Sequence, residues 1–262
     1  MQKNTAKETL QAGGTVYGTS LTDCLDPEFA SLLRAAGLDF FFVDTEHSPA
    51  NYHQIQALCR AARGAGIVPL VRVTENVPHL ITRALDSGVM GIVVPRVHSS
   101  HEACAAVEAM KFTPEGRRGF GMRSTITDFG WTNAVDEMAS ANRETLAVLQ
   151  VESREALSYV EEIATTPNLD VLFIGPYDLT ISLGIAEQFD HPEFWGAVDR
   201  VVSACQKTGV AAGLQSADMA VVREAKNRGA RFLLYSNDVS VLFEGYKQGI
   251  GALKGAAKEH PR

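Results

Sequence analysis

Short apolar runs alternate with amphipathic stretches along this chain, in the way that buried strands alternate with helices. Residues 146–151 (LAVLQV) and 170–175 (DVLFIG) are apolar and rich in β-branched side chains, as strands buried on both faces are. Between them, residues 153–165 carry apolar side chains at the i, i+3, i+4, i+7 and i+8 spacing of a helix with one buried face. The pattern predicts a strand, a crossover helix and a second strand parallel to the first.

The same alternation continues through the rest of the chain. We expect strands at residues 14–19, 38–43, 67–71, 89–94, 146–151, 170–175, 210–214 and 231–235. Eight strand–helix repeats in 262 residues indicate an α/β fold of the (β/α)₈ TIM-barrel type in a single domain, residues 1–262. A doubly wound open sheet is the alternative, but no GxGxxG follows the first strand and no GxxxxGK[ST] occurs.

Two segments depart from the alternation. Residues 1–12 form a polar N-terminal segment. Residues 112–142 interrupt the rhythm with the sequence PEGRRGFGMRSTITDFGWTNA, which contains Phe129 and Trp131. A loop of this length is usually functional, and we expect it at the active site or at a subunit contact.

Composition narrows the classes of function. A hydrophobic fraction of 45% and a charged fraction of 21% are ordinary for a globular chain, and the net charge of −7 argues against nucleic acid or an anionic membrane as a partner. The apolar run near residues 89–95 is too short to cross a bilayer. The four cysteines form no CxxC pair, and the first residues contain no signal-like apolar stretch. These features predict a cytoplasmic protein.

Charged and polar side chains gather where the predicted strands end, which is where TIM barrels place their active sites. The residues are Asp44, Glu46, His47, Arg72, Gln150, Glu152 and Asp178. Glu152 and Asp178 are oxygen ligands on two rigid strand ends that face one space, as a catalytic Mg²⁺-type site requires. Either acid alone could instead cap the helix that follows it. Convergence of all these groups on one rim is harder to explain by packing, because clustered charges carry a desolvation cost.

Lysine and histidine positions restrict the chemistry further. An enzyme that activates a ketone can use a lysine Schiff base or a metal ion. No lysine of this chain ends a predicted strand, which favours the metal. Among the histidines, His98 also follows a strand and is the competitor to His47 as a proton carrier.

Six segments in this order, FFVDTEHSP, PLVRV, GIVVPRV, PEGRRGFG, QVES and FIGPYDL, resemble the HpcH/HpaI family of metal-dependent (class II) 2-oxo-acid aldolases. The resemblance extends from Gly14 to the last predicted helix. It implies that Glu152 and Asp178 hold a divalent metal and that no organic cofactor is needed. It also implies a homo-oligomer, a hexamer built as a trimer of dimers, with active sites near the subunit interfaces.

The resemblance further assigns the substrate-binding residues. Arg72 and Gln150 would bind the 2-oxo acid together with the backbone of Gly175, Pro176, Tyr177 and Asp178. His47, paired with Asp44, would be the acid/base group, acting through a metal-bound water or the substrate hydroxyl. Mg²⁺, Mn²⁺ and Co²⁺ all suit such a site, and each acts as a Lewis acid that makes the methyl protons of pyruvate more acidic. Arg72 and the metal would stabilise the enolate, which adds to an aldehyde to give a 4-hydroxy-2-oxo acid.

Two positions depart from the family pattern. Residues 122–129 lack the additional arginines of relatives that act on dicarboxylate aldehydes, which leaves the aldehyde open. Gln215 ends the seventh predicted strand, where an apolar residue near the pyruvate methyl is expected. If Gln215 faces the donor, a hydroxylated donor such as hydroxypyruvate becomes possible.

Four other functions remain as alternatives. The same enolate could serve decarboxylation of oxaloacetate, or C–C bond formation on a larger acceptor as in macrophomate synthase. Acyl-CoA chemistry of the citrate-lyase β-subunit type is disfavoured, because the sequence shows no basic site for the nucleotide. A non-catalytic binder of 2-oxo acids is disfavoured as well, because a binder does not need a positioned proton carrier.

Overall fold

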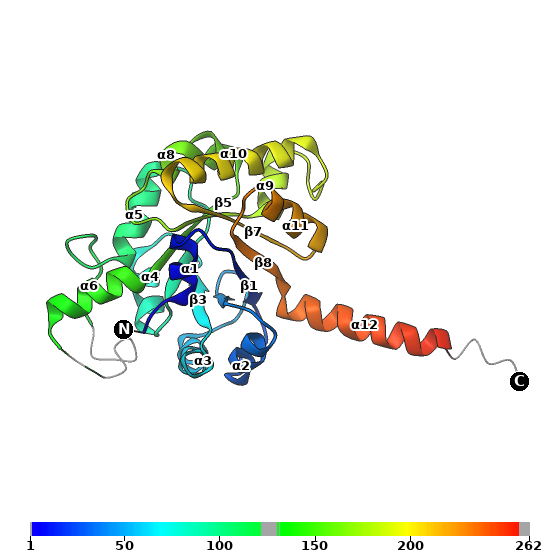
Figure 1. Cartoon of the computed structure of the whole chain (residues 1–262), viewed down its shortest axis with the longest axis horizontal. Coiled ribbons are helices and arrows are strands. Elements are labelled where there is room, and N and C mark those ends of the chain that lie inside the picture. The colour runs from blue at the N-terminus through cyan, green and yellow to red at the C-terminus, as the bar shows by residue number, and fades with distance from the viewer. Residues whose placement is uncertain (1, 122–129, 131, 257–262) are drawn as a thin grey trace, which may run out of the picture.

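The protein folds as a closed barrel of eight parallel strands in the order β1 to β8, as the computed structural model shows for residues 2–121, 130 and 132–256 (Figure 1). The predicted (β/α)₈ TIM barrel is confirmed. The strands are β1 (Val16–Leu21), β2 (Phe40–Asp44), β3 (Val68–Arg72), β4 (Gly91–Val94), β5 (Leu146–Val151), β6 (Val171–Ile174), β7 (Ala211–Ser216) and β8 (Phe232–Asn237).

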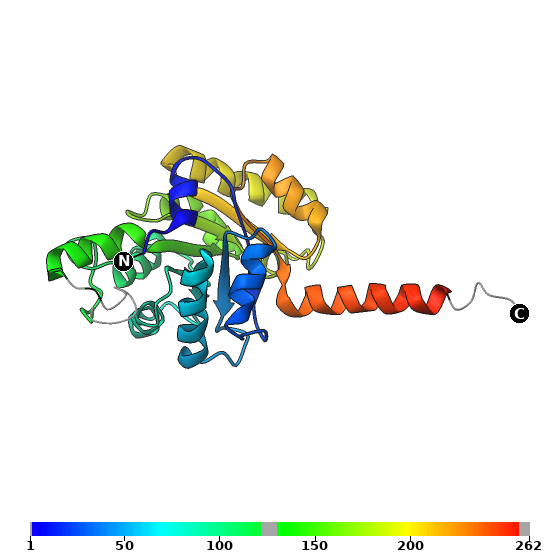
Figure 2. The same ribbon diagram turned by 60° about the horizontal axis from the view of Figure 1, so that its bottom comes forward.

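Helices surround the barrel, with one exception at the C-terminal end of the described chain. The helices are α1 (Thr5–Gln11), α2 (Glu28–Ala35), α3 (Tyr52–Ala65), α4 (Pro78–Asp86), α5 (Ser100–Met110), α6 (Ala134–Glu144), α7 (Arg154–Ser158), α8 (Val160–Ala164), α9 (Pro176–Leu183), α10 (Pro192–Thr208), α11 (Met219–Asn227) and α12 (Asp238–Ala256). Figures 1 and 2 show α12 projecting away from the body as a single rod. No helix in the described ranges is both long and apolar enough to cross a bilayer.

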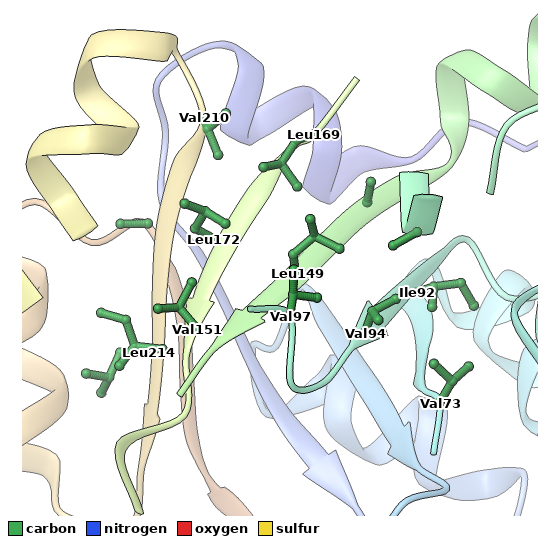
Figure 3. Close-up of a cluster of buried hydrophobic side chains, with 14 of the residues drawn as sticks. Val73, Ile92, Val94, Val97, Leu149, Val151, Leu169, Leu172, Val210 and Leu214 are labelled. Carbon is green, nitrogen blue, oxygen red and sulfur yellow. The ribbon is translucent and has the colours of Figure 1, made fainter. Parts of the chain in front are cut away.

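Two hydrophobic layers hold the strands, which explains why the strand sequences are apolar at nearly every position. Inside the barrel, Phe40 stacks on Phe232 with ring centroids 4.2 Å apart, and Phe173 meets Phe232 edge-on at 5.8 Å. Outside, the alternate strand residues pack under the helices. Figure 3 shows part of this outer layer, with Leu149 and Leu172 on neighbouring strands. Alternation between the two layers fixes which strand residues face the barrel axis.

Helix α6 occupies the end of the segment that the sequence analysis describes as a loop over residues 112–142. Asn133 caps this helix by accepting a hydrogen bond from the backbone N–H of Asp136, and two acidic residues lie in its first turn. Such a cap together with early acids stabilises a helix start, so the described loop is shorter than expected. The predicted contributions of Phe129 and Trp131 lie outside the described residues.

The polar N-terminal segment also folds as a helix, α1, which lies at the amino end of the barrel. Its buried Lys7 donates hydrogen bonds to the carbonyl of Thr145 at 2.8 Å and to the carboxylate of Asp170 at 2.9 Å. Asn4 caps the helix and donates to two backbone carbonyls. These polar side chains are buried because their hydrogen bonds are satisfied, which composition alone does not reveal.

Candidate active site

A cavity of about 390 Å³ opens at the carboxyl ends of the strands. Nearly all of the site residues predicted from the sequence line it, namely Asp44, His47, Arg72, Gln150, Gly175, Pro176, Tyr177, Asp178 and Gln215. Glu152 lies directly behind this wall, in contact with Gln150 and Gly175. The structure therefore brings the predicted residues together, with one carboxylate in a more buried place than the others.

Arg72 and Asp44 form a two-point ion pair across neighbouring strands. The two residues are register partners in β2 and β3, so their side chains start side by side. Arg72 donates from Nε to Asp44 Oδ1 at 3.0 Å and from Nη2 to Asp44 Oδ2 at 2.5 Å. Burial lowers the pKa of Arg72, but the hydrogen bonds and charge of Asp44, together with the nearby Glu46 and Glu152, outweigh burial and raise the pKa. The guanidinium is a fixed positive charge in the cavity wall.

The predicted pairing of His47 with Asp44 needs correction. The backbone N–H of His47 donates to Asp44 Oδ1 at 3.3 Å, whereas the imidazole is 64% exposed and has Nε2 4.0 Å from Glu46 Oε2. Asp44 instead pairs with Arg72, because a guanidinium presents two donors that match the two carboxylate oxygens. His47 still lines the cavity, so its ring can reach a bound molecule.

Glu152 is held between two neighbours, and a glycine packs against it. Its Oε1 accepts from the backbone N–H of Arg96 at 2.7 Å, and its Oε2 accepts from Gln150 Nε2 at 2.5 Å. A Cβ atom on Gly175 would lie 2.5 Å from Glu152 Oε2 and 2.6 Å from Gln150 Nε2. Only glycine leaves room for this carboxylate and amide. The other amide atom, Gln150 Oε1, is buried and has no hydrogen-bond partner among the residues that the structure describes.

The environment of Glu152 opposes its negative charge. Burial, helped by the nearby charges of Asp178 and Glu46, raises the pKa of Glu152 to about 7, against the lowering effect of the Arg96 N–H and of Arg72. A buried carboxylate near other acids is the kind of group whose charged form a cation would stabilise.

A divalent metal ion fits these donors. Glu152 and the exposed Asp178 would supply two carboxylate oxygens, while water and substrate oxygens would complete the coordination, as Mg²⁺ and Mn²⁺ prefer. Among the described residues, no group of three or more His, Cys, Asp or Glu side chains is arranged to hold a metal.

Helix α9 starts at the cavity. Gly175 is its N-cap and Pro176 its first residue, so the N–H groups of Tyr177 and Asp178 belong to the first turn, where helical N–H groups have no intrahelical acceptor. All four residues line the cavity. Free N–H groups at a helix start favour a bound carboxylate.

Arg96, which lies in the segment GIVVPRV, was given no role in the site by the sequence. Its backbone has a positive φ of 51°, which directs its N–H to Glu152. Its guanidinium lies 3.1 Å from Glu46 and donates to the carbonyl of Thr74. Ser20, Thr22, Ser236 and Asn237, which also line the cavity, were missed as well. The available signal was their position, since each follows or ends a strand as the predicted residues do.

Comparisons with known proteins agree with this geometry. The model of the family described as HpcH/HpaI aldolase/citrate lyase matches residues 24–244. A hydroxypyruvate/pyruvate aldolase of Paraburkholderia phytofirmans is 32% identical over 253 residues, covering 94% of this chain and 96% of that protein. A 4-hydroxy-2-oxo-heptane-1,7-dioate aldolase of Salmonella paratyphi B is 31% identical over 257 residues, covering 98% and 97%. The crystal structure of an HpcH/HpaI aldolase from Desulfitobacterium hafniense matches with a TM-score of 0.91 at 33% identity, covering 97% of each chain.

The packing at Gly175 predicts a steric effect on stability. Gly175 has φ −90°, which alanine also adopts, so Gly175→Ala acts through its contact with Glu152 and Gln150. We expect a loss of roughly 1–3 kcal/mol in the free energy of unfolding, measured by urea denaturation. Gly196→Ala is the matched control, because Gly196 lies in α10 with open space around its Cβ position, and alanine there is expected to be neutral or stabilising. Equal effects of the two substitutions would contradict the tight packing.

The raised pKa of Glu152 predicts a pH-dependent difference between the wild type and Glu152→Gln. Between pH 4.5 and about 7, the folded protein keeps the Glu152 proton that the unfolded chain has released, so wild-type stability falls as pH rises through this window. At about 1.4 kcal/mol per pKa unit, the wild type should lose on the order of 3 kcal/mol relative to the variant. Urea unfolding in chelator-containing buffer from pH 4 to pH 8 measures this difference. Parallel stability curves would show that Glu152 is not desolvated.

Proposed function

The chain belongs to the HpcH/HpaI aldolase/citrate lyase family and is a carbon–carbon lyase of the 2-oxo-acid aldolase type, and we propose that it uses a divalent metal to join pyruvate or hydroxypyruvate to an aldehyde. The reverse reaction cleaves a 4-hydroxy-2-oxo acid. The observation that carries the proposal is the convergence of a fixed guanidinium, a helix N-terminus and the carboxylate of Asp178 at one cavity, with the carboxylate of Glu152 directly behind its wall.

The donor would bind between Arg72 and the start of α9. Arg72 uses Nε and one N–H of Nη2 on Asp44, so three of its five N–H groups remain for the donor. The donor carboxylate would accept hydrogen bonds from the N–H groups of Tyr177 and Asp178. Glu152 and Asp178 would hold the metal, which when bound supplies Lewis-acid polarisation of the donor ketone.

His47 would move the proton. Among the described residues that line the cavity, it is the one imidazole, and its exposure leaves it free to approach a substrate. It would take a proton from the donor carbon next to the ketone, directly or through a water. The charge of the resulting enolate would fall on the oxygen that faces Arg72. The enolate carbon then attacks the aldehyde carbon, and His47 returns the proton to the aldehyde oxygen, which becomes the new hydroxyl.

Deuterium exchange into the methyl group of pyruvate, followed by NMR, tests enolate formation without an aldehyde. We expect exchange by the chelator-treated protein only after Mg²⁺ or Mn²⁺ is added, and loss of at least a hundredfold in Glu152→Ala and His47→Ala, which remove a metal ligand and the proton carrier. His98→Ala is the matched control, since His98 also follows a strand but does not line this cavity.

If no form of the protein exchanges the methyl protons of pyruvate, the aldolase proposal is rejected. Release of CO₂ from oxaloacetate in the absence of an aldehyde would favour a decarboxylase. Repeating the assay with hydroxypyruvate on wild type and Gln215→Leu tests the donor, because a leucine cannot hydrogen-bond the donor hydroxyl. An unchanged preference between the two donors would reject contact of Gln215 with the donor.

We also propose a homo-oligomer in which α12 of one copy lies on the barrel of another. A groove of about 650 Å³ runs between α2 and α11 over β1 and β8, and its lining is largely apolar. In a (β/α)₈ barrel the helix after the last strand would cover this place, but α12 projects into solvent (Figures 1 and 2). Its outward apolar face consists of Val239, Leu242, Phe243, Tyr246, Ile250 and Leu253, which are 44–73% exposed. The apolar lining of the groove and the apolar face of α12 are both exposed. In an oligomer, α12 of one copy could cover the groove of another.

Light scattering after size exclusion tests this assembly. The wild type is expected at a multiple of the 28.3 kDa chain mass, and Tyr246→Asp on α12 or Leu32→Asp in the groove should give the monomer mass, because either places a charge in the apolar contact. Glu244→Ala, on the opposite face of α12, is the control and should keep the wild-type mass. A monomeric wild type would refute the proposal.

A further inference from the structure

Two buried lysines meet at the amino end of the barrel, on the far side from the active-site cavity. Lys7 lies in α1, and Lys111 is the C-cap of α5. Both residues are buried, and Lys111 is only 1% exposed. Their Nζ atoms donate to one oxygen, the carbonyl of Thr145, at 2.8 Å from Lys7 and 2.9 Å from Lys111. The two amines are therefore close neighbours in a place that water hardly reaches.

One buried carboxylate serves both amines. Lys7 forms an ion pair with Asp170 at 2.9 Å. Lys111 forms no ion pair with a carboxylate among the described residues, and donates to the carbonyls of Asn142 at 2.7 Å and Thr145. If Lys111 is neutral, the charges of Lys7 and Asp170 cancel. If Lys111 is protonated, the cluster carries an unbalanced buried charge, which costs desolvation free energy.

The hydrogen bonds also fit a neutral Lys111. A neutral amine has two N–H groups and one lone pair, and the two carbonyl contacts of Lys111 use both N–H groups. Lys7, as an ammonium, has three N–H groups, of which Thr145 and Asp170 accept two. The third is left to donate to the lone pair of Lys111 Nζ, and this hydrogen bond is among the causes that lower the pKa of Lys111. Protonation would turn the acceptor into a donor that faces another donor.

The surroundings oppose a charge on Lys111. Burial, helped by the charge of Lys7, lowers the pKa of Lys111 to about 7, against the raising effect of Asp170 and Glu115. Glu115 is exposed, so water and salt screen its charge. Asp170 is already paired with Lys7.

The remaining charged groups near the two lysines line a cavity of about 590 Å³ beside them, and are Lys3, Glu8, Arg143 and Glu144. Lys3 pairs with Glu8 at 2.6 Å, and Glu144 accepts a hydrogen bond from the backbone N–H of Asn4 at 2.7 Å. Arg143 is exposed. None of these groups therefore supplies Lys111 with a buried counter-charge.

Helix α1 closes the amino end of the barrel next to this pair. Ala6 and Leu10 of α1 belong to the hydrophobic cluster inside the barrel, and Lys7 lies between them in the sequence. We propose that Lys111 is a neutral amine in the folded protein and that its protonation releases α1 from the amino end of the barrel. The two lysines and α1 thus form a latch that opens in response to protons. This inference does not depend on the proposed aldolase, whose site lies at the other end of the strands.

Protonation and release are linked because the open form takes up the proton. Once α1 leaves, water reaches Lys111, and its pKa returns toward the ordinary value of 10.5. Between about pH 7 and pH 10.5, the open form therefore binds one more proton than the closed form. The open fraction should rise about tenfold for each unit by which the pH falls within this window, and should become constant below about pH 7.

Amide hydrogen exchange of α1, followed by mass spectrometry from pH 6 to pH 9.5, tests the latch. Protection factors divide out the intrinsic pH dependence of exchange, and in the wild type they should fall about tenfold per unit from pH 9.5 to pH 7. Lys111→Met keeps a long side chain without the amine, so the protection of α1 should no longer depend on pH. Lys207→Met is the matched control, because Lys207 is exposed in the last turn of α10, and it should keep the wild-type slope.

Lys7→Met is a second variant that leaves Lys111 to donate to both carbonyls. It removes the neighbouring ammonium, so the pH below which the protection of α1 is constant should rise by at least one unit. Protection that does not change between pH 7 and pH 9.5 in the wild type would overturn the inference, as would an unchanged slope in Lys111→Met. An equal slope in peptides from α10 would also overturn it, because the proton would then be linked to unfolding of the whole barrel and not to release of α1.

Discussion

The arrangement of the site depends on the positive charge of Arg72, which lies among several acids. Asp44 pairs with Arg72 directly, Glu46 Oε2 lies 3.5 Å from Arg72 Nε, and the charge of Arg72 also acts on Glu152. Acids clustered this closely would repel each other, and each loses hydration on burial. Removing the guanidinium of Arg72 would leave Asp44 without its counter-charge. Arg72 is therefore a structural requirement of the rim as well as a candidate contact to substrate.

The barrel makes this cluster possible because its strands are rigid and lie between two packed hydrophobic layers. The interior aromatic ring contacts and the outer layer hold each strand end in place, so a side chain at a strand end needs little further support (Figure 3). Glycine then permits the closest approach. At Gly175 the backbone of one strand end lies against the carboxylate of the neighbouring strand, a contact that any larger residue would prevent.

The sequence predicted the barrel and most of the rim, because both depend on local periodicity. Strand β5 was predicted with its observed bounds, and the polar residues Asp44, Arg72 and Gln215 at or near strand ends do line the cavity. Contacts between residues far apart in the sequence could not be predicted from local periodicity. The partner of Asp44 is decided by strand register, and the direction of the Arg96 N–H by a positive φ. Burial of Lys7 depends on two acceptors more than 100 residues away, the carbonyl of Thr145 and the carboxylate of Asp170. The outward path of α12 has no local signal in its sequence.

The division of the cavity follows from the order of the strands around the barrel. Charged groups on adjacent strands can share counter-charges, as Arg72 does, so acids and a guanidinium are stable together on one arc. The ends of β7, β8 and β1 line the other side of the cavity with hydroxyl and amide groups, namely those of Ser20, Gln215, Ser236 and Asn237. If charged residues were spread evenly around the rim, their fields would partly cancel at the centre. Segregation of charge is thus a property of the closed barrel that a list of site residues does not contain.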